Sequence, residues 1–178
     1  AALVLTLNNV ALSAEKTIGQ ALTIGGDTGA GNKVTVVATN ANITATNGYG
    51  VIIYNPVDMT LTNSVVTAYG ALYFKAADGS QGSAGSVVKT INTELNTMNL
   101  HTAATNQFGT VVFEDNNITV TMENGQISAV AGVVLGTIEQ YAVLMKNNVT
   151  GIKFETNANT LVYGNDISTL LQGNLDGN

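Results

Sequence analysis

The side chains that could take part in catalysis are few and dispersed along this 178-residue chain. Its twelve acidic residues stand singly, except for Glu114 and Asp115, and neighbouring residues of a strand point to opposite faces. The chain has one histidine, six lysines, no arginine and no cysteine. Because acid–base catalysis needs titratable groups that converge on one point, we expect no enzymatic activity. A fold that stacks repeats could still bring distant acids together, so an enzyme stays open as an alternative.

Two further features are candidates for binding a metal ion. His101 has neither a second histidine nor a carboxylate close by in its sequence phrase, so we expect a solvated position rather than a zinc site. Residues 25–32 are rich in glycine but lack the spacing of phosphate-binding loops and of calcium-binding repeats. We expect a flexible loop there and no cofactor, with weak calcium binding at Asp27 as the alternative.

Four tyrosines are the candidate ligand contacts: Tyr49, Tyr54, Tyr69 and Tyr73. Aromatic rings beside amide-rich strands can form platforms for a glycan, because a ring offers an apolar face and a polar edge. The same four residues are equally candidates for the core.

The composition excludes several classes of partner. A net charge of −6, without clusters of basic side chains, argues against nucleic acid and against an anionic membrane surface. The apolar runs are too short to span a membrane. A chain rich in Asn, Thr and Gly, and poor in Lys, is unusual for a cytosolic enzyme, so we expect an extracellular or cell-surface location.

Two short phrases recur along the chain. The first places an aliphatic residue after Asn or Asp and before Thr-x-Thr, as at residues 42–48, 58–64 and 117–125. The second places Gly before a run of apolar residues, and its glycines are Gly50, Gly70, Gly109 and Gly132. The segments are β-branched or aromatic and are punctuated by turn residues, so they predict strands. A period of about 20 residues predicts an all-β solenoid, a single right-handed parallel β-helix.

The phrases assign structural roles to three kinds of residue. We expect the aliphatic residues Ile43, Met59, Ile118 and Val149 to occupy equivalent inward sites. The glycines should lie where a Cβ would clash or where φ is positive, and the asparagines at left-handed turn positions, where their amides can bond along the stack. The Thr-x-Thr pairs at 44/46, 60/62 and 119/121 could form an outward array of the ice-binding kind, but ordinary β-propensity explains them.

The chain therefore divides into one domain, 1–178, with three regions. Residues 1–32 form an N-terminal cap region with a short helical turn near Ser13, residues 33–165 the repeat coils, and residues 166–178 a capping helix or tail. Three Asn-x-Thr sequons, at Asn42, Asn117 and Asn148, come with the repeat, and we expect no glycosylation from them.

Phrases such as residues 70–74 and 109–116 resemble the coils of pectin-lyase-like right-handed β-helices. They are most similar to the passenger repeats of autotransporter-type and polymorphic-membrane-type bacterial surface proteins, over about residues 33–165. The resemblance implies an adhesin or a scaffold, or else a polysaccharide lyase or hydrolase. Lyases of this kind use Arg or Lys as the base, together with calcium, and this chain has no Arg.

These observations favour a secreted, non-catalytic surface module that displays loops such as 76–86 and binds a surface glycan or a protein receptor. A carbohydrate-active enzyme is the alternative, which a carboxylate and a lysine within about 6 Å in a groove would favour. A third possibility is a filament subunit that self-associates through a solenoid end, where the apolar segment 1–7 would pair with a neighbour's open edge.

Overall fold

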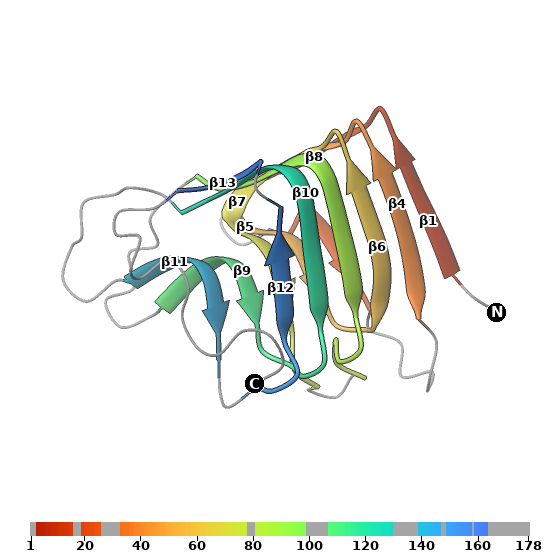
Figure 1. The fold of residues 1–178 in the computed structure, drawn as a ribbon. Helices are drawn as coiled ribbons and strands as arrows, with labels where there is room; N and C mark the ends of the chain where they lie inside the picture. Colours follow the sequence, from red (N-terminus) through yellow and green to blue (C-terminus); the bar gives the residue numbers. More distant parts are fainter. Residues whose placement is uncertain are drawn as a thin grey trace.

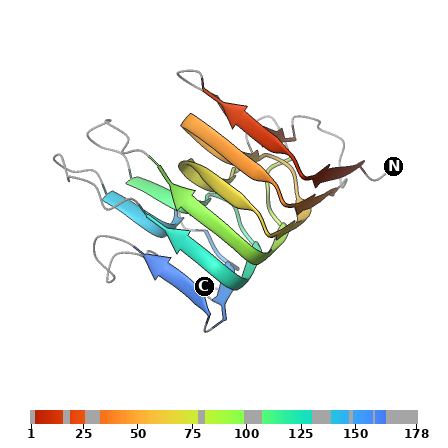
Figure 2. The same cartoon turned by 90° about the horizontal axis from the view of Figure 1, so that it is seen from above.

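The computed structural model describes residues 3–15, 19–25, 33–77, 81–98, 107–129, 139–146, 149–157 and 159–163. This part of the chain is all β and contains no helix. Every pair of strands in it runs parallel, and the chain winds so that each coil stacks on the previous one (Figures 1 and 2). The protein is a parallel β-solenoid, as the repeats predict.

The strands form three faces of the solenoid. The first face contains β1, β4, β6, β12 and the N-terminal halves of β8 and β10, which lie side by side in Figure 1. The second face contains β2, β13, the N-terminal parts of β5 and β7, and the C-terminal halves of β8 and β10. The third face contains β3, β9, β11 and the C-terminal parts of β5 and β7. The strands are β1 (Leu3–Asn8), β2 (Ala11–Ala14), β3 (Leu22–Ile24), β4 (Val34–Thr39), β5 (Asn42–Ile53), β6 (Val57–Thr62), β7 (Val65–Phe74), β8 (Val87–Thr97), β9 (Gln107–Phe113), β10 (Thr119–Ser128), β11 (Glu139–Met145), β12 (Lys153–Thr156) and β13 (Thr160–Tyr163).

The core is built from columns of aliphatic side chains, one from each coil. Alternate residues of a strand point inward, so the register that pairs the backbones also stacks like on like. The central columns of the three faces are Val36–Met59–Val88–Val120, Ile43–Val66–Leu95–Ile127 and Val51–Leu72–Val111–Val143, all buried. Phe74 and Phe113 stack with ring centroids 5.2 Å apart.

Asparagines turn the corner between the first and second faces. Asn9, Asn40, Asn63, Asn92 and Asn124 all have φ between 49° and 54°, the left-handed region that Asn tolerates better than other non-glycine residues. Their side chains bond along the stack, with Nδ2 of Asn40 donating to Oδ1 of Asn9 at 2.9 Å and Nδ2 of Asn92 to Oδ1 of Asn63 at 3.3 Å. This confirms the predicted role of the asparagines.

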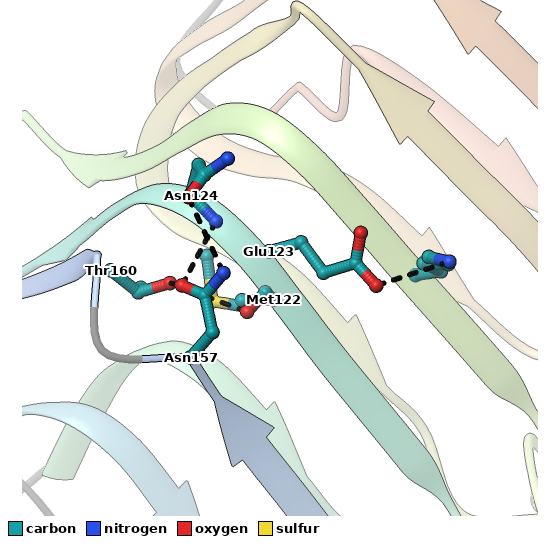
Figure 3. A network of polar contacts seen from close by, with 6 residues as sticks. Met122, Glu123, Asn124, Asn157 and Thr160 are labelled. Atoms are coloured by element: carbon teal, nitrogen blue, oxygen red, sulfur yellow. Dashed lines mark hydrogen bonds and ion pairs between the residues drawn. The ribbon is translucent and has the colours of Figure 1, made fainter.

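The same corner continues to the last described coil. Asn157 donates its Nδ2 to Oδ1 of Asn124 at 3.3 Å and accepts from the Asn124 backbone N–H at 3.2 Å (Figure 3). Thr160 adds hydrogen bonds to Asn157 and to the Met122 carbonyl. Asparagine side chains therefore tie three pairs of adjacent coils together at this edge, through Asn9–Asn40, Asn63–Asn92 and Asn124–Asn157.

The coils are longer than the expected 20 residues. The corner residues Asn9, Asn40, Asn63, Asn92, Asn124 and Asn157 are separated by 31, 23, 29, 32 and 33 positions from the first pair of coils to the last. Within each face the strands stack in register, while the β5–β7 pairing shifts between Ala45 and Tyr49, where the chain passes from the second face to the third. The recurring sequence phrases do mark strands, but successive copies lie on different faces of the solenoid. Their spacing is therefore shorter than one coil.

The four aliphatic residues expected at equivalent inward sites, Ile43, Met59, Ile118 and Val149, are all buried. They do not occupy equivalent positions in successive coils, so this part of the expectation is wrong. Ile43 lies in the second face and stacks on Val66, whereas Met59 lies in the first face and stacks on Val88. Ile118 lies just before β10, two positions ahead of the column that contains Met59. Similar local sequences fold onto different faces, because any strand with one buried side has the same alternation.

The glycines of the second phrase permit close packing, as predicted. A Cβ on Gly50 would lie 2.4 Å from Cγ1 of Val66, and one on Gly70 would lie 2.8 Å from the ring of Tyr49. Gly70 and Gly109 precede the paired residues Leu72 and Val111 by two positions, so they share a column. Gly132 lies outside the described residues.

The structure describes part of the expected N-terminal cap region but not the expected C-terminal one. Residues 1–32 contain β1, β2 and β3, which stack on β4 and β5 as a further coil. Ser13 and Ala14 belong to β2, so the helical turn expected near Ser13 is absent at these two residues. Residues 166–178, expected as a capping helix or tail, lie outside the described part of the chain.

Candidate functional site

The structure brings together three of the four candidate tyrosines. Tyr49, Tyr54 and Tyr73 belong to one cluster on the outer side of the third face, where they pack with Ile52, Val112, Tyr141 and Leu144. The Tyr49 and Tyr73 rings meet edge to face with centroids 4.5 Å apart. Tyr69 is not a member of this cluster and donates its hydroxyl to Oδ1 of Asn47 at 3.2 Å.

Charged groups close around Tyr73. Its hydroxyl donates to Oε2 of Glu114, and Oε1 of the same carboxylate pairs with Nζ of Lys75 at 3.1 Å. The ammonium groups of Lys75 and Lys146 lie 4.9 and 5.7 Å from the centre of the Tyr73 ring. Lys75, Glu114 and Lys146 directly follow β7, β9 and β11, so the cluster joins three successive coils of the third face.

The pKa shifts in this cluster have clear physical causes. Burial raises the pKa of Tyr49 to about 12, and the nearby charge of Glu114 adds to the effect. Burial and the hydrogen bond to Glu114 also raise the pKa of Tyr73. Burial alone would raise the pKa of Glu114, but the hydrogen bonds from Tyr73 and Lys75 and the positive charges of Lys75 and Lys146 lower it overall. The cluster is a neutral phenol bound to a carboxylate that stays ionised.

This arrangement makes Tyr73 a structural residue rather than a ligand platform. Its side chain is only 5 % exposed, so its ring face is covered by its neighbours. A tyrosine whose pKa is raised is also a poor general base, because it keeps its proton at neutral pH. The alternative stated from the sequence, that these aromatics pack with other side chains, describes Tyr73 best.

The neighbouring acids Glu114 and Asp115 follow the end of β9 and contact different partners. Glu114 faces Tyr73 and Lys75, whereas Oδ2 of Asp115 accepts the backbone N–H of Ala84 at 3.2 Å. Asp115 thereby anchors the end of the 76–86 segment, in which Ser83 and Ser86 are fully buried and hydrogen-bonded. The described part of this expected display loop is thus tied to the solenoid at its C-terminal half.

Three lysine–carboxylate pairs lie closer than the distance of about 6 Å that would favour an enzymatic site in a groove. Besides Lys75–Glu114, Lys89 lies 3.2 Å from Glu123 and Lys153 lies 3.1 Å from Glu155. The last two pairs are about half exposed on the open first face. Among the described residues no group of three or more His, Cys, Asp and Glu side chains is placed to hold a metal ion.

A second candidate site lies on the outer side of the second face. The register stacks Thr44, Thr67, Asn96 and Ser128 in one outward column across four successive coils. Gln126 stands two residues before Ser128 in β10, and Tyr69 stands two residues after Thr67 in β7. All six side chains are partly exposed. We call Thr44, Thr67, Tyr69, Asn96, Gln126 and Ser128 the amide–hydroxyl strip.

Hydrogen bonds order one end of the strip. Oδ1 of Asn96 accepts from Nε2 of Gln126 at 2.7 Å and from Oγ of Ser128 at 2.8 Å. These bonds hold three side chains of two coils in one arrangement, with the amide nitrogen of Asn96 not used by either bond. Glu94, which pairs with Gln126 across the strands, is the carboxylate nearest to this column in the register.

Sequence reasoning found Tyr69 but missed the rest of the strip. The Thr-x-Thr pattern allows an outward array that includes Thr44, Thr60 and Thr119, but Thr60 and Thr119 lie on the first face and Thr44 on the second. On the first face, Thr60 stacks on Lys89 and then Thr121, so the threonines alternate with other residue types. The members of the strip are uncharged polar residues on the outward side of the second-face strands, and their stacking becomes visible only with the correct coil length.

Several sequence-based candidates cannot be placed. His101, Asp27 and Asn148 lie outside the described residues, whereas Asn42 and Asn117 are exposed sequon asparagines. The described residues contain no helix long and apolar enough to cross a membrane.

Comparison with family models gives no match for this chain, and neither the curated proteins nor the solved structures provide a significant relative. The solenoid and its surface chemistry are therefore the basis for a functional assignment.

Proposed function

We propose that this protein is a non-catalytic extracellular surface module, a right-handed β-helix of the pectin-lyase-like kind that binds a glycan through the amide–hydroxyl strip. The observation that carries the proposal is the outward column Thr44–Thr67–Asn96–Ser128, with Gln126 and Tyr69 beside it. Successive rungs of a sheet are about 4.8 Å apart, so the strip is a regular ladder of donors and acceptors.

The chemistry of the strip suits a sugar better than a charged ligand. Hydroxyl and amide groups both donate and accept hydrogen bonds, as the hydroxyls of a sugar do. The partly exposed Tyr69 ring offers an apolar surface to the C–H face of a pyranose, and its hydroxyl bond to Asn47 fixes its position. The Gln126–Asn96–Ser128 bonds fix the donor side chains before the ligand arrives, which reduces the entropy cost of binding.

The distribution of charge supports a scaffold. Of the five lysines in the described residues, Lys75 and Lys89 pair with acids of the next coil, Lys153 pairs within its own strand, Lys146 lies over the Tyr73 ring, and Lys33 is exposed. Charged groups thus contribute mainly to holding the coils together. A rigid rod whose ligand-binding strip is built from uncharged side chains, beside Glu94, is the design expected of an adhesin-like module at a cell surface.

A screen on a glycan array followed by calorimetric titration of the selected glycan tests the proposal. Replacing Asn96 with Ala removes the acceptor of two strip bonds and should weaken binding about tenfold or more, which corresponds to about 1.4 kcal/mol. The matched control is Thr60→Ala, a partly exposed position on the first face, which should bind like the wild type. Equal losses in both variants, or no binding to any neutral glycan, would refute the site.

The carbohydrate-active enzyme remains a second candidate because of one observation. Lys75 and Glu114 lie 3.1 Å apart on adjacent coils, beside Tyr73 and Lys146. Prolonged incubation with neutral and acidic polysaccharides, with analysis of reducing ends and unsaturated products, separates the two proposals. Turnover that survives repurification and disappears in Glu114→Gln would favour the enzyme.

A further inference from the structure

One carboxylate stands beside the amide–hydroxyl strip. Glu94 precedes Asn96 by two positions in β8, so both side chains lie on the outer side of the second face. In the register Glu94 pairs with Gln126 of the next coil and with Val65 of the previous one. Its side chain is partly exposed, so it borders the surface on which a ligand of the strip would lie.

Glu94 is the one charged residue of the described second-face segments. These segments are residues 11–14, 42–45, 65–68, 94–97, 125–128 and 160–163, and only residue 94 among them is charged. The ion pairs between described residues involve Glu114, Glu123 and Glu155 instead. No described lysine forms an ion pair with Glu94, so its charge stays available to a ligand.

The hydrogen bonds of the strip leave a second acceptor beside this carboxylate. Gln126 donates its Nε2 to Oδ1 of Asn96 at 2.7 Å, which leaves Oε1 as the acceptor end of the Gln126 amide. Adjacent rungs of a sheet lie about 4.8 Å apart, so Gln126 and Glu94 are nearest neighbours across the strands. A carboxylate and an amide oxygen accept hydrogen bonds and donate none. Together they suit a ligand group that donates several hydrogen bonds and carries a positive charge.

We propose that Glu94 determines the specificity of the strip by binding the protonated amine of a glycan whose amino sugars are not N-acetylated. An ammonium group has several donors and a positive charge, which complement the carboxylate of Glu94 and the amide oxygen of Gln126. The carboxylate of a uronic acid meets the like charge of Glu94 and is disfavoured. Neutral sugars bind through the hydroxyl and amide groups of the strip, but more weakly.

This inference rests on the proposed glycan-binding function, because it assigns a charge preference to the same strip. The members of the strip are uncharged, so the preference comes from their neighbour Glu94. The whole protein has a net charge of −6 and attracts any polycation to some extent. A test must therefore separate Glu94 from this general attraction.

Calorimetric titration with matched oligosaccharides tests the preference. The probes are a glucosamine oligomer, the N-acetylglucosamine oligomer of the same length and a galacturonic acid oligomer, at about pH 5.5, where an amine of this kind is protonated. The wild type should bind the glucosamine oligomer about tenfold more tightly than the acetylated one, and the galacturonic acid oligomer least. Equal affinities for the first two probes, or tightest binding of the acidic one, would overturn the inference.

Substitutions of Glu94 and one control assign the preference to this residue. Glu94→Gln should lower the affinity for the glucosamine oligomer about tenfold, to that of the acetylated one. Glu94→Lys should reverse the order, so that the galacturonic acid oligomer binds better than the glucosamine oligomer. Asp58→Asn removes the same charge from an exposed position of the first face and should keep the wild-type preference. Equal losses in Glu94→Gln and Asp58→Asn would show that the preference comes from the net charge and would refute the role of Glu94.

The outcomes separate this inference from the proposed function. A wild type that binds neutral glycans in an Asn96-dependent way, without a preference for the amine, refutes the role of Glu94 and leaves the strip as the binding site. A wild type that binds none of the three oligomers and no glycan of the array refutes both. Circular dichroism spectra and melting curves check that the variants are folded, and the comparison of the three probes on the wild type needs no variant.

Discussion

Thr90 is the clearest polar mismatch within the core. It is fully buried in an inward column between Leu61 and Met122, and its hydroxyl has no hydrogen-bond partner. An unsatisfied buried hydroxyl costs about 1–3 kcal/mol, while valine has nearly the same shape. We expect Thr90→Val to raise the free energy of unfolding by about 1 kcal/mol, measured by urea denaturation. The control is Thr93→Val, whose hydroxyl bonds the Leu61 and Ile91 carbonyls, and which should lose stability.

The corner asparagines combine a backbone role with a side-chain role. Asn40 has φ 52° and donates its side-chain amide to Asn9. Asn40→Ala loses this bond and places a Cβ without a compensating amide in the left-handed region, so we expect a loss of about 1–2 kcal/mol in the free energy of unfolding. Asn40→Gly loses only an exposed hydrogen bond and should cost less. Equal costs in both variants would show that the backbone conformation does not matter at this corner.

Glu114 gives the fold a defined acid sensitivity. Its pKa in the folded protein lies below the ordinary value of 4.5, because the hydrogen bonds and charges around it outweigh burial. A group with a lowered folded pKa stabilises the protein above its unfolded pKa and loses this contribution as the pH falls through the folded pKa. The melting temperature of the wild type should therefore fall below about pH 4.5, and Glu114→Gln should make that fall shallower.

Glu123→Gln is the matched control, because its ion pair with Lys89 is about half exposed and such pairs contribute little. If the melting temperature of Glu114→Gln falls at acid pH as steeply as that of the wild type, Glu114 is not the cause of the acid sensitivity.

At the scale of the strand, alternation decides which substitutions the solenoid tolerates. Ile118 is fully buried just before β10, whereas the adjacent Thr119 is partly exposed and pairs with Lys153 in the register. Ile118→Asp places an unpaired carboxylate in the core and should cost well above the roughly 1 kcal/mol of an average substitution. Thr119→Asp should stay close to the wild type. A melting temperature of Ile118→Asp within a degree or two of the wild type would contradict an inward Ile118.

The elements were predictable because their signals are local. Strand type, the turn asparagines and the close packing at Gly50 and Gly70 follow from residue propensity and from backbone sterics. The register between coils was not predictable in the same way. It depends on which of several similar strands lie on top of one another, and residues 42–48 and 58–64 have the same pattern on different faces.

The unknown register between coils also explains why the candidate site could not be predicted from the sequence. Tyr73 was identified as a functional candidate, but its burial depends on Tyr49, Glu114 and Lys146, which come from other coils. The amide–hydroxyl strip is likewise a product of stacking, since its members are 23 to 32 positions apart along the column. Only a correct coil length brings these residues together.

At the scale of the whole molecule, the coils are joined on all sides by different interactions. The asparagine corner links the first and second faces, the Tyr73 cluster links coils on the third face, and aliphatic columns fill the interior. A rod of this kind keeps its outward columns in fixed register, so it can present a repeating ligand surface without closing around the ligand. This property is what the proposed binding module requires.

The most direct test of the binding module is an NMR titration of isotope-labelled protein with the glycan selected on the array. We predict that the shifted amide signals belong to Thr44, Thr67, Tyr69, Asn96, Gln126, Ser128 and their immediate neighbours. The ligand's own signals should remain unchanged during long incubation, because nothing is turned over. Shifts concentrated around Lys75 and Glu114 or on the first face, or the appearance of product signals, would contradict a non-catalytic strip on the second face.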